Sequence, residues 1–136
     1  MAIVEQLIRS ENDATLSFGN YELNEKAKVE DFPFEGSSYK VKTYQEITRL
    51  EKDGVFVYES VPGTGVKGFH ASENGVEFLV SGKEDAQLTV GLLEGETYNV
   101  FVNGEKVGDM KTNMSGKLSI SVELSDGTEV PVKITK

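Results

Sequence analysis

The stretch 117-KLSISVELSDGTEVPVKITK-136 decides the fold class, because it contains two runs in which apolar and polar residues alternate. The apolar positions of the two runs are Leu118, Ile120, Val122 and Leu124, and then Val130, Val132 and Ile134. Alternation with a period of two places every second side chain on the same face of an extended strand. The stretch therefore predicts two strands, each with one buried face.

Pro131 lies on the outward face of the second of these strands. Proline has no backbone N–H and cannot donate to a neighbouring strand. Its position predicts that this strand is an edge strand or contains a bulge.

Turn signals recur upstream at short intervals between alternating or apolar segments. The dipeptides are Asp53-Gly54, Asn74-Gly75, Asn103-Gly104 and Asp126-Gly127. Each supplies the positive φ angles that tight hairpin turns require. Together with the alternation they predict an all-β protein.

Residues 69–136 contain about six or seven such segments at the spacing expected of an immunoglobulin-like sandwich. Between Val107 and Met110 the alternation slips at Gly108, which predicts a β-bulge. Residues 92–124 include a Tyr-x-Val-x-Val-x-Gly pattern and a Ser-Gly-Lys turn before an alternating strand. This segment resembles the small immunoglobulin-like accessory modules of bacterial surface proteins and carbohydrate-active enzymes. We expect residues 69–136 to form an immunoglobulin-like β-sandwich.

The N-terminal half is less regular. Residues 3–8 could form a short helical turn, but their β-branched residues favour a hairpin with residues 10–18. Thr43 and Glu46 could likewise form the capping box of a helix that ends before Gly54. The Asp53-Gly54 turn favours two paired strands instead. We expect residues 1–68 to form a β-hairpin or small-sheet module that packs on the C-terminal sandwich.

Residues 61–70, VPGTGVKGFH, have the glycine spacing of a phosphate-binding loop. Such a loop needs lysine and then serine or threonine after its last glycine, and a helix must begin there. Phe69 and His70 occupy these positions, so we interpret the stretch as a connector. His70 is the only histidine, and we expect it to be solvent-facing or hydrogen-bonded rather than catalytic.

Composition excludes several function classes. The chain has no cysteine, which removes thiol catalysis and thiolate metal sites. Its net charge of −9 is spread over both halves, so we expect neither nucleic acid nor a membrane surface as a partner. The sequence contains no motif for a metal or a cofactor, and we expect none. Without a recognisable signal peptide, a cytoplasmic location is the expectation.

Aromatic residues are concentrated in the N-terminal half. Phe18, Phe32 and Phe56 suit a small β-core. An exposed aromatic face could instead bind a partner protein or a sugar ring. The candidate binding residues are Tyr21, Phe32, Phe34, Tyr39, Tyr44 and Tyr58.

The chain resembles a known protein family in four segments that are spread along its length. They are LIRSENDATLSFGNYEL (7–23), YKVKTY (39–44), GVFVYESVPGTGV (54–66) and MKTNMSGKLSISVEL (110–124). With these segments the chain resembles a family of short bacterial proteins that are sometimes labelled endosialidase. Sialidases hold the sugar carboxylate with three arginines, whereas this chain has two, Arg9 and Arg49. We therefore predict no sialidase activity.

The sequence thus predicts a non-catalytic structural or protein-interaction protein, which binds a partner protein or a second copy of itself. The alternative is a carbohydrate-binding accessory module that uses the N-terminal tyrosines. A hydrolase that uses His70 is the third hypothesis.

Overall fold

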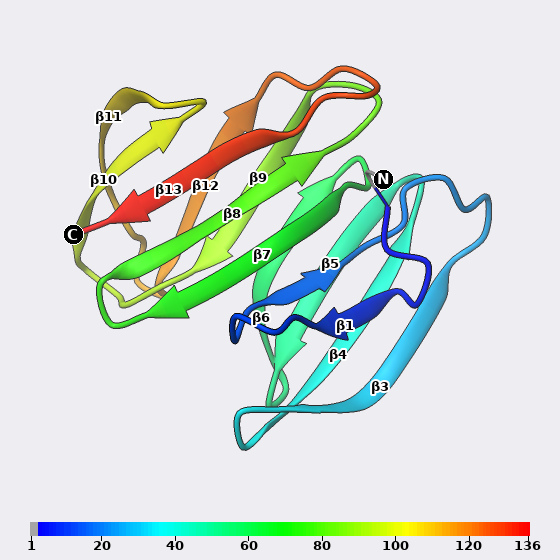
Figure 1. Cartoon of the computed structure of the whole chain (residues 1–136). Helices are drawn as coiled ribbons and strands as arrows, with labels where there is room; N and C mark the ends of the chain where they lie inside the picture. The colour runs from blue at the N-terminus through cyan, green and yellow to red at the C-terminus, as the bar shows by residue number, and fades with distance from the viewer. Residues whose placement is uncertain (1–2) are drawn as a thin grey trace.

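The computed structural model describes residues 3–136, in which thirteen strands form two antiparallel sheets (Figure 1). Sheet A contains, in spatial order, β1 (Ile8–Ser10), β2 (Leu16–Phe18), β7 (Gly65–Ser72), β8 (Gly75–Ser81), β13 (Val130–Thr135), β10 (Thr97–Val102) and β11 (Glu105–Lys111). Sheet B contains β12 (Lys117–Val122), β9 (Ala86–Gly91), β6 (Val55–Val61), β5 (Ile47–Lys52), β4 (Ser37–Tyr44) and β3 (Ala27–Phe34). The prediction of an all-β protein is confirmed.

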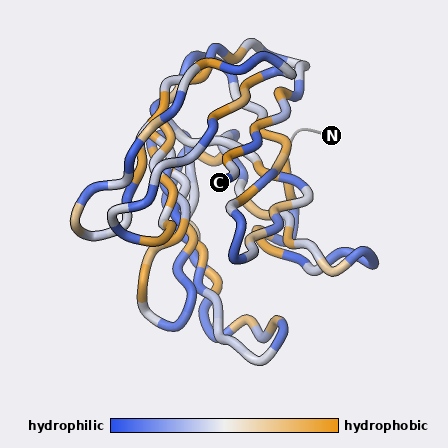
Figure 2. Tube along the Cα trace, turned by 90° about the vertical axis from the view of Figure 1, so that its left-hand side faces the viewer, coloured by the Kyte–Doolittle hydropathy of each residue, from blue (hydrophilic) through white to orange (hydrophobic). Residues whose placement is uncertain are grey.

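One hydrophobic core lies between the two sheets. Alternate residues of the strands point into it, and Figure 2 shows short hydrophobic and hydrophilic stretches alternating along the chain. At its centre the ring of Tyr58, from sheet B, packs edge-on against Phe18, Phe69 and Phe78 of sheet A, at centroid distances of 5.3, 6.2 and 5.5 Å. Edge-to-face pairs of this kind add to the stabilisation that burial provides.

Both sheets combine strands from the two halves of the chain. In sheet A, β2 pairs with β7, and in sheet B, β6 pairs with β9. The expected boundary between residues 68 and 69 lies inside β7, and the core takes side chains from both sides of it. The sheets therefore do not follow the expected division into a module of residues 1–68 and a sandwich of residues 69–136.

Local turn chemistry matches the expectations at two of the four dipeptides, since Asn74 and Asp126 do not have the expected positive φ angles. The dipeptides Asp53-Gly54 and Asn103-Gly104 have positive φ angles and join β5 to β6 and β10 to β11. Residues 37–44 and 47–52 are strands, so the strand interpretation is confirmed over the short helix. The N-terminal hairpin of β1 and β2 is also present. The register of β10 and β11 shifts between Val100 and Phe101, at the bulge predicted near Gly108.

The interpretation of Asp126-Gly127 as a hairpin turn is wrong. The strands on either side of it belong to different sheets, since β12 pairs with β9 and β13 pairs with β8 and β10. Residues 123–129 therefore carry the chain from sheet B to sheet A. Alternation identified both strands, but it carries no information about which strands pair.

The edge or bulge expected from Pro131 is also wrong, because β13 lies in the interior of sheet A and keeps a regular register with β8. The carbonyl oxygen of Pro131 accepts a hydrogen bond from Asn103 N–H at 2.8 Å. In an antiparallel strand the N–H and C=O of one residue point to the same neighbour. The missing donor of Pro131 therefore faces the turn after β10, where no strand pairing is lost.

Candidate functional site

Of the stretch 61–70, which was interpreted as a connector, only residues 62–64 cross between the sheets, because Val61 ends β6 and residues 65–70 belong to β7. Residues 62–64 leave β6 of sheet B, and β7 of sheet A begins at Gly65. Thr64 is fully buried at this crossing, together with Thr43, Thr48 and Ser60. A buried polar group is costly unless it finds a hydrogen-bond partner.

Thr48 Oγ1 is the centre of the hydrogen-bond network that satisfies these groups. It donates to the carbonyl oxygen of Thr64 at 2.8 Å and accepts from Thr64 N–H at 3.0 Å. Because its single hydrogen is used in this way, Thr43 must donate the 2.8 Å bond between the two hydroxyls. Thr43 Oγ1 in turn accepts from Asn20 N–H at 2.9 Å. The network ties β4 and β5 to the crossing.

Tyr58 belongs to the same buried network. Its hydroxyl and that of Ser60 each lie 2.7 Å from Thr64 Oγ1. Burial raises the pKa of Tyr58 above its ordinary value, and its hydrogen bonds with Thr64 and Ser60 act in the opposite direction. The tyrosine is therefore a neutral structural group at the centre of the core.

The aromatic residues that the sequence singled out do not form one exposed face. Tyr21, Tyr39 and Tyr58 are buried, and Tyr21 and Tyr39 have pKa values raised mainly by that burial. The remaining three candidates, Phe32, Phe34 and Tyr44, are half-buried. Phe34 packs edge-on against Tyr39 at 5.9 Å. The structure thus uses most of these rings for packing.

Phe56 differs from its expected place in the core. It is half-buried on the outer face of sheet B, where the Arg49 guanidinium and the Lys117 ammonium lie 4.9 and 4.5 Å from its ring centroid. The register of β5 and β6 shifts between Leu50 and Glu51, which pairs Phe56 with the outward Glu51. This shift is why the alternation did not reveal the face on which Phe56 lies.

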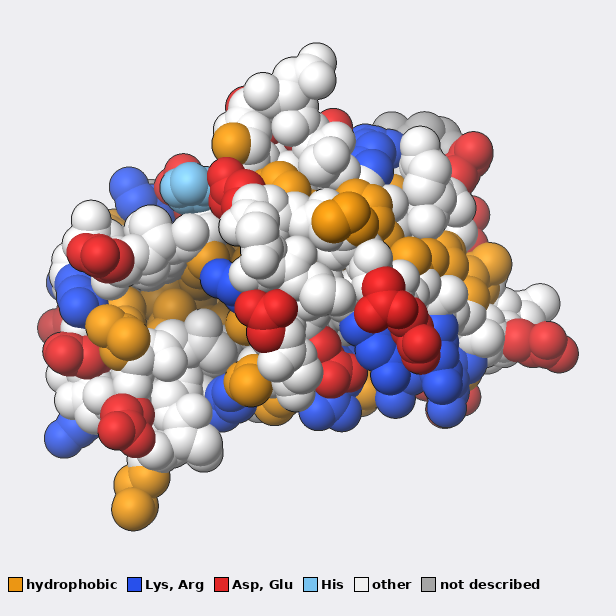
Figure 3. Space-filling view, turned by 90° about the horizontal axis from the view of Figure 1, so that it is seen from below, with side chains coloured by type: hydrophobic (Ala, Val, Ile, Leu, Met, Phe, Trp, Pro, Cys, Tyr) orange, Lys and Arg blue, Asp and Glu red, His pale blue; other side chains and the backbone are white. Residues whose placement is uncertain are grey.

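The outer face of sheet B also carries three cations directly opposite one another, Lys28, Lys42 and Arg49. Figure 3 shows Lys and Arg side chains gathered beside Asp and Glu side chains on one part of the face seen from below. Like charges at directly opposed positions destabilise a sheet. Among the described residues, Arg49 is paired with Glu59 at 3.7 Å, whereas Lys42 has no ion pair.

We expect Lys42→Glu to raise the free energy of unfolding by about 0.5 kcal/mol, because it places a carboxylate between Lys28 and Arg49. The matched control is Lys40→Glu on the same strand and face. Lys40 lies opposite Glu51 and 3.7 Å from Glu30, so this variant should lose stability. Urea unfolding at low salt measures both changes. Equal shifts of the same sign would contradict the expected repulsion among Lys28, Lys42 and Arg49.

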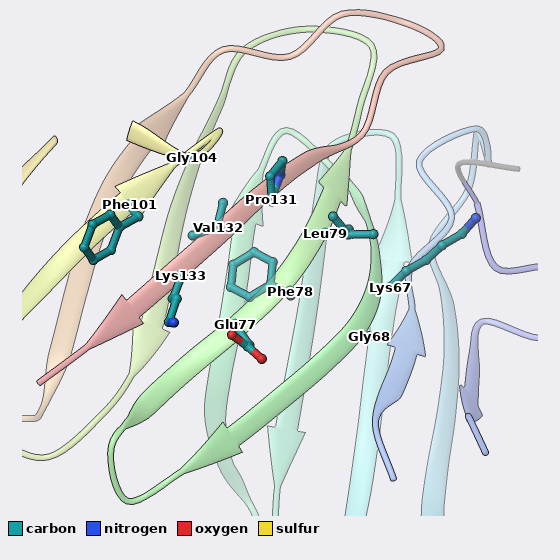
Figure 4. Close-up of a pocket in the computed structure, with 10 residues that line it drawn as sticks. All are labelled: Lys67, Gly68, Glu77, Phe78, Leu79, Phe101, Gly104, Pro131, Val132 and Lys133. Atoms are coloured by element: carbon teal, nitrogen blue, oxygen red, sulfur yellow. The ribbon is translucent and has the colours of Figure 1, made fainter. Parts of the chain in front are cut away.

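The outer face of sheet A is hollowed by a groove of about 550 Å³. We call it the sheet A groove, and its lining residues are Lys67, Gly68, Glu77, Phe78, Leu79, Phe101, Gly104, Pro131, Val132 and Lys133. Figure 4 shows Phe101, Pro131 and Leu79 in a row across β10, β13 and β8. Pro131 is paired directly with Leu79, whose side chain remains 38% exposed. The volume is in the range of ligand-binding pockets.

Charged side chains flank this apolar row. Glu77 and Lys133 lie directly opposite each other next to it, and Phe101 is paired with Lys133 on the other side. At the far end Lys67 forms an ion pair with Glu129 at 3.3 Å. The groove therefore combines an apolar floor with a rim of both charges.

Leu79 and Phe101 were not among the residues that the sequence patterns singled out, although a signal was present. Leu79 lies between buried Phe78 and Val80, at a position where alternation predicts a polar, outward residue. Phe101 occupies the same kind of position in β10. An outward face of an antiparallel sheet usually carries polar residues. Apolar residues that break this pattern mark the groove.

His70 is exposed on β7, as expected, and no hydrogen bond or ion pair of its side chain is found within residues 3–136. The same residues include no cluster of three histidine, aspartate or glutamate side chains that could hold a metal ion. Nor do they include a helix that is long and apolar enough to cross a membrane. The sheet A groove, with its apolar row and its charged rim, is the candidate functional site.

Comparison of the chain with protein-family models, with curated proteins and with solved structures finds no match in any of the three. Inference about function therefore starts from the chemistry of the groove.

Proposed function

We propose that the protein is a non-catalytic protein-interaction protein that binds an extended apolar segment of a partner protein in the sheet A groove. The observation that carries the proposal is the apolar row of Leu79, Pro131 and Phe101 on a solvent-facing sheet. Exposed apolar surface with a polar rim is typical of interaction sites.

The shape and chemistry of the groove support a polypeptide as the occupant. The groove crosses four neighbouring strands and is open to solvent at Gly68 and Gly104, which lack side chains. Its rim carries Lys133 and Glu77, which complement flanking charges of either sign. A sugar would need a flat aromatic platform, and Tyr21, Tyr39 and Tyr58 are buried elsewhere.

A peptide display selection on the immobilised full chain tests this proposal. We expect enriched peptides to carry aromatic or aliphatic residues and to bind Leu79→Lys at least about tenfold more weakly, since a lysine in the groove removes the central apolar contact. The matched control is Val55→Lys on sheet B, where the side chain is 59% exposed. Absence of enriched peptides, or equal loss of binding in both variants, would count against the groove.

A further inference from the structure

A cavity of about 300 Å³ opens between the two sheets, at the end of the sandwich where the turns of several hairpins gather (Figure 1). We call it the end cavity, and it has no lining residue in common with the sheet A groove. Figure 3 views the molecule from this end, and hydrophobic side chains are visible there in a hollow between polar ones. The apolar and aromatic lining includes Leu16, Phe69 and Tyr98 from sheet A and Tyr39 and Val57 from sheet B.

The bulge in β6 explains part of this space. The register shift between Leu50 and Glu51 turns Phe56 to the outer face and leaves Val57 without a directly opposed residue on β5. Val57 is half-buried and lines the end cavity. The inner face therefore receives the small side chain of Val57 here, while the larger ring of Phe56 lies on the other side of the sheet.

Tyr98 supplies a hydrogen-bond donor at the wall of the end cavity. Its side chain belongs to a residue that is only 1% exposed. The hydroxyl oxygen accepts a hydrogen bond from the backbone N–H of Leu93 at 3.3 Å, and Leu93 also lines the cavity. Within residues 3–136 no acceptor is found for the hydroxyl hydrogen. A buried donor without an acceptor is costly, so this hydroxyl favours a ligand that brings an acceptor.

The charged residues of the end cavity lie at its mouth. Glu35, Lys52 and Glu73 are exposed, and none of them forms an ion pair within the described chain. The two carboxylates repel an anion that approaches the mouth. The apolar interior offers no opposite charge to an ion of either sign, and burying an unpaired ion is costly. The ligand that fits the interior is therefore uncharged.

We propose that the end cavity binds an uncharged, apolar small molecule that carries one carbonyl group, whose oxygen accepts the hydrogen of the Tyr98 hydroxyl. The volume of about 300 Å³ lies at the lower end of the range for ligand pockets. It is about twice that of an apolar cavity of about 150 Å³ that binds benzene. The cavity therefore accommodates a ligand with about two fused rings. This site is independent of the proposed function of the sheet A groove.

Calorimetric titration of the full chain with methyl naphthyl ketone tests the proposal. We expect saturable binding at one site per chain. Naphthoate, which has the same rings but a charged carboxylate, should bind at least about tenfold more weakly. Leu79→Lys changes the sheet A groove and should bind the ketone as the unchanged chain does. Absence of saturable binding, tighter binding of naphthoate, or loss of ketone binding in Leu79→Lys would overturn the proposal.

Tyr98→Phe tests the hydrogen bond, because it keeps the ring and removes only the hydroxyl. The affinity for methyl naphthyl ketone should fall about fivefold. The affinity for isopropylnaphthalene, which has a similar shape but no acceptor, should stay the same. The matched control is Tyr21→Phe, since Tyr21 is also buried but does not line the end cavity. Equal changes for the two ligands in Tyr98→Phe would contradict the role of the hydroxyl as a donor.

Val57→Phe tests the location of the site. The larger side chain reduces the volume of the end cavity and should weaken the binding of both ligands by about tenfold or more. Thermal unfolding shows whether this variant folds, and Tyr98→Phe tests the proposal if it does not. Unchanged affinity for both ligands in a folded Val57→Phe would place the ligand elsewhere and overturn the proposal.

Discussion

Thr48→Val lowers the free energy of unfolding by about 3 kcal/mol, because it leaves several buried polar groups without a partner. Valine keeps the shape of threonine but cannot bond to the backbone N–H and C=O of Thr64 or to the hydroxyl of Thr43. All three groups are enclosed where β6 crosses to β7. For a chain of this size the loss corresponds to a fall in Tm of roughly 10 °C.

The matched control is Thr89→Val in the same sheet. Among residues 3–136 the Thr89 hydroxyl bonds only to Ser119 Oγ, at 2.9 Å on the exposed face, so its loss should change stability by less than about 0.5 kcal/mol. Thermal and urea unfolding measure both variants. Equal and small effects would mean that Thr48 does not hold the crossing.

Gly19→Ala is the second substitution with a large expected effect, a loss of more than about 3 kcal/mol. Gly19 has a φ of +98°, a region that disfavours a side chain. A Cβ there would also lie 2.3 Å from the carbonyl oxygen of Thr64. That oxygen accepts the hydrogen bond from Thr48, so the added methyl group would displace the same crossing.

Gly36→Ala separates the penalty of a positive φ angle from the steric clash of the added methyl group. Gly36 has a φ of +82°, and a methyl group added there would meet no heavy atom within 4 Å, so only the backbone penalty of about 1–2 kcal/mol applies. Differential scanning calorimetry of both variants gives the comparison. If the two alanines cost the same, the close approach of Gly19 to Thr64 is not present in solution.

Much of the secondary structure could be predicted from local patterns. The alternation at Leu118, Ile120 and Val122 identified a strand, and Asp53-Gly54 decided between strand and helix for the segment before it. These signals depend on residues that are neighbours in sequence. The pairing of β2 with β7 joins residues about fifty positions apart, and no local pattern carries that information.

The arrangement of the two halves of the chain could not be predicted either, because it also depends on contacts between residues that are far apart in the sequence. The turn at Asp126-Gly127 has hairpin chemistry, yet it lies in a segment that crosses between sheets. The interpretation of residues 61–70 as a connector holds only for residues 62–64, because β7 begins at Gly65. The buried bonds of Thr64, which fix that connector, depend on contacts with distant strands.

The candidate site could be predicted only in part. Pro131 was recognised as an outward residue, but its partners Leu79 and Phe101 come from strands that the sequence alone does not place beside it. Conversely, Tyr39 and Tyr58, two of the tyrosines that suggested a binding face, belong to the core, because a sandwich of two sheets needs large side chains to fill it. Burial of this kind follows from the sheet pairing and not from the composition.

The sheet A groove is central to the proposed function, as the surface that binds the partner. The most direct measurement is a two-dimensional ¹H–¹⁵N NMR titration of the full chain with a peptide enriched by display. We predict that the largest shifts are confined to the groove residues of β7, β8, β13 and β10, among them Gly68, Leu79, Phe101 and Lys133. Shifts concentrated instead on the outer face of sheet B would contradict the proposed function.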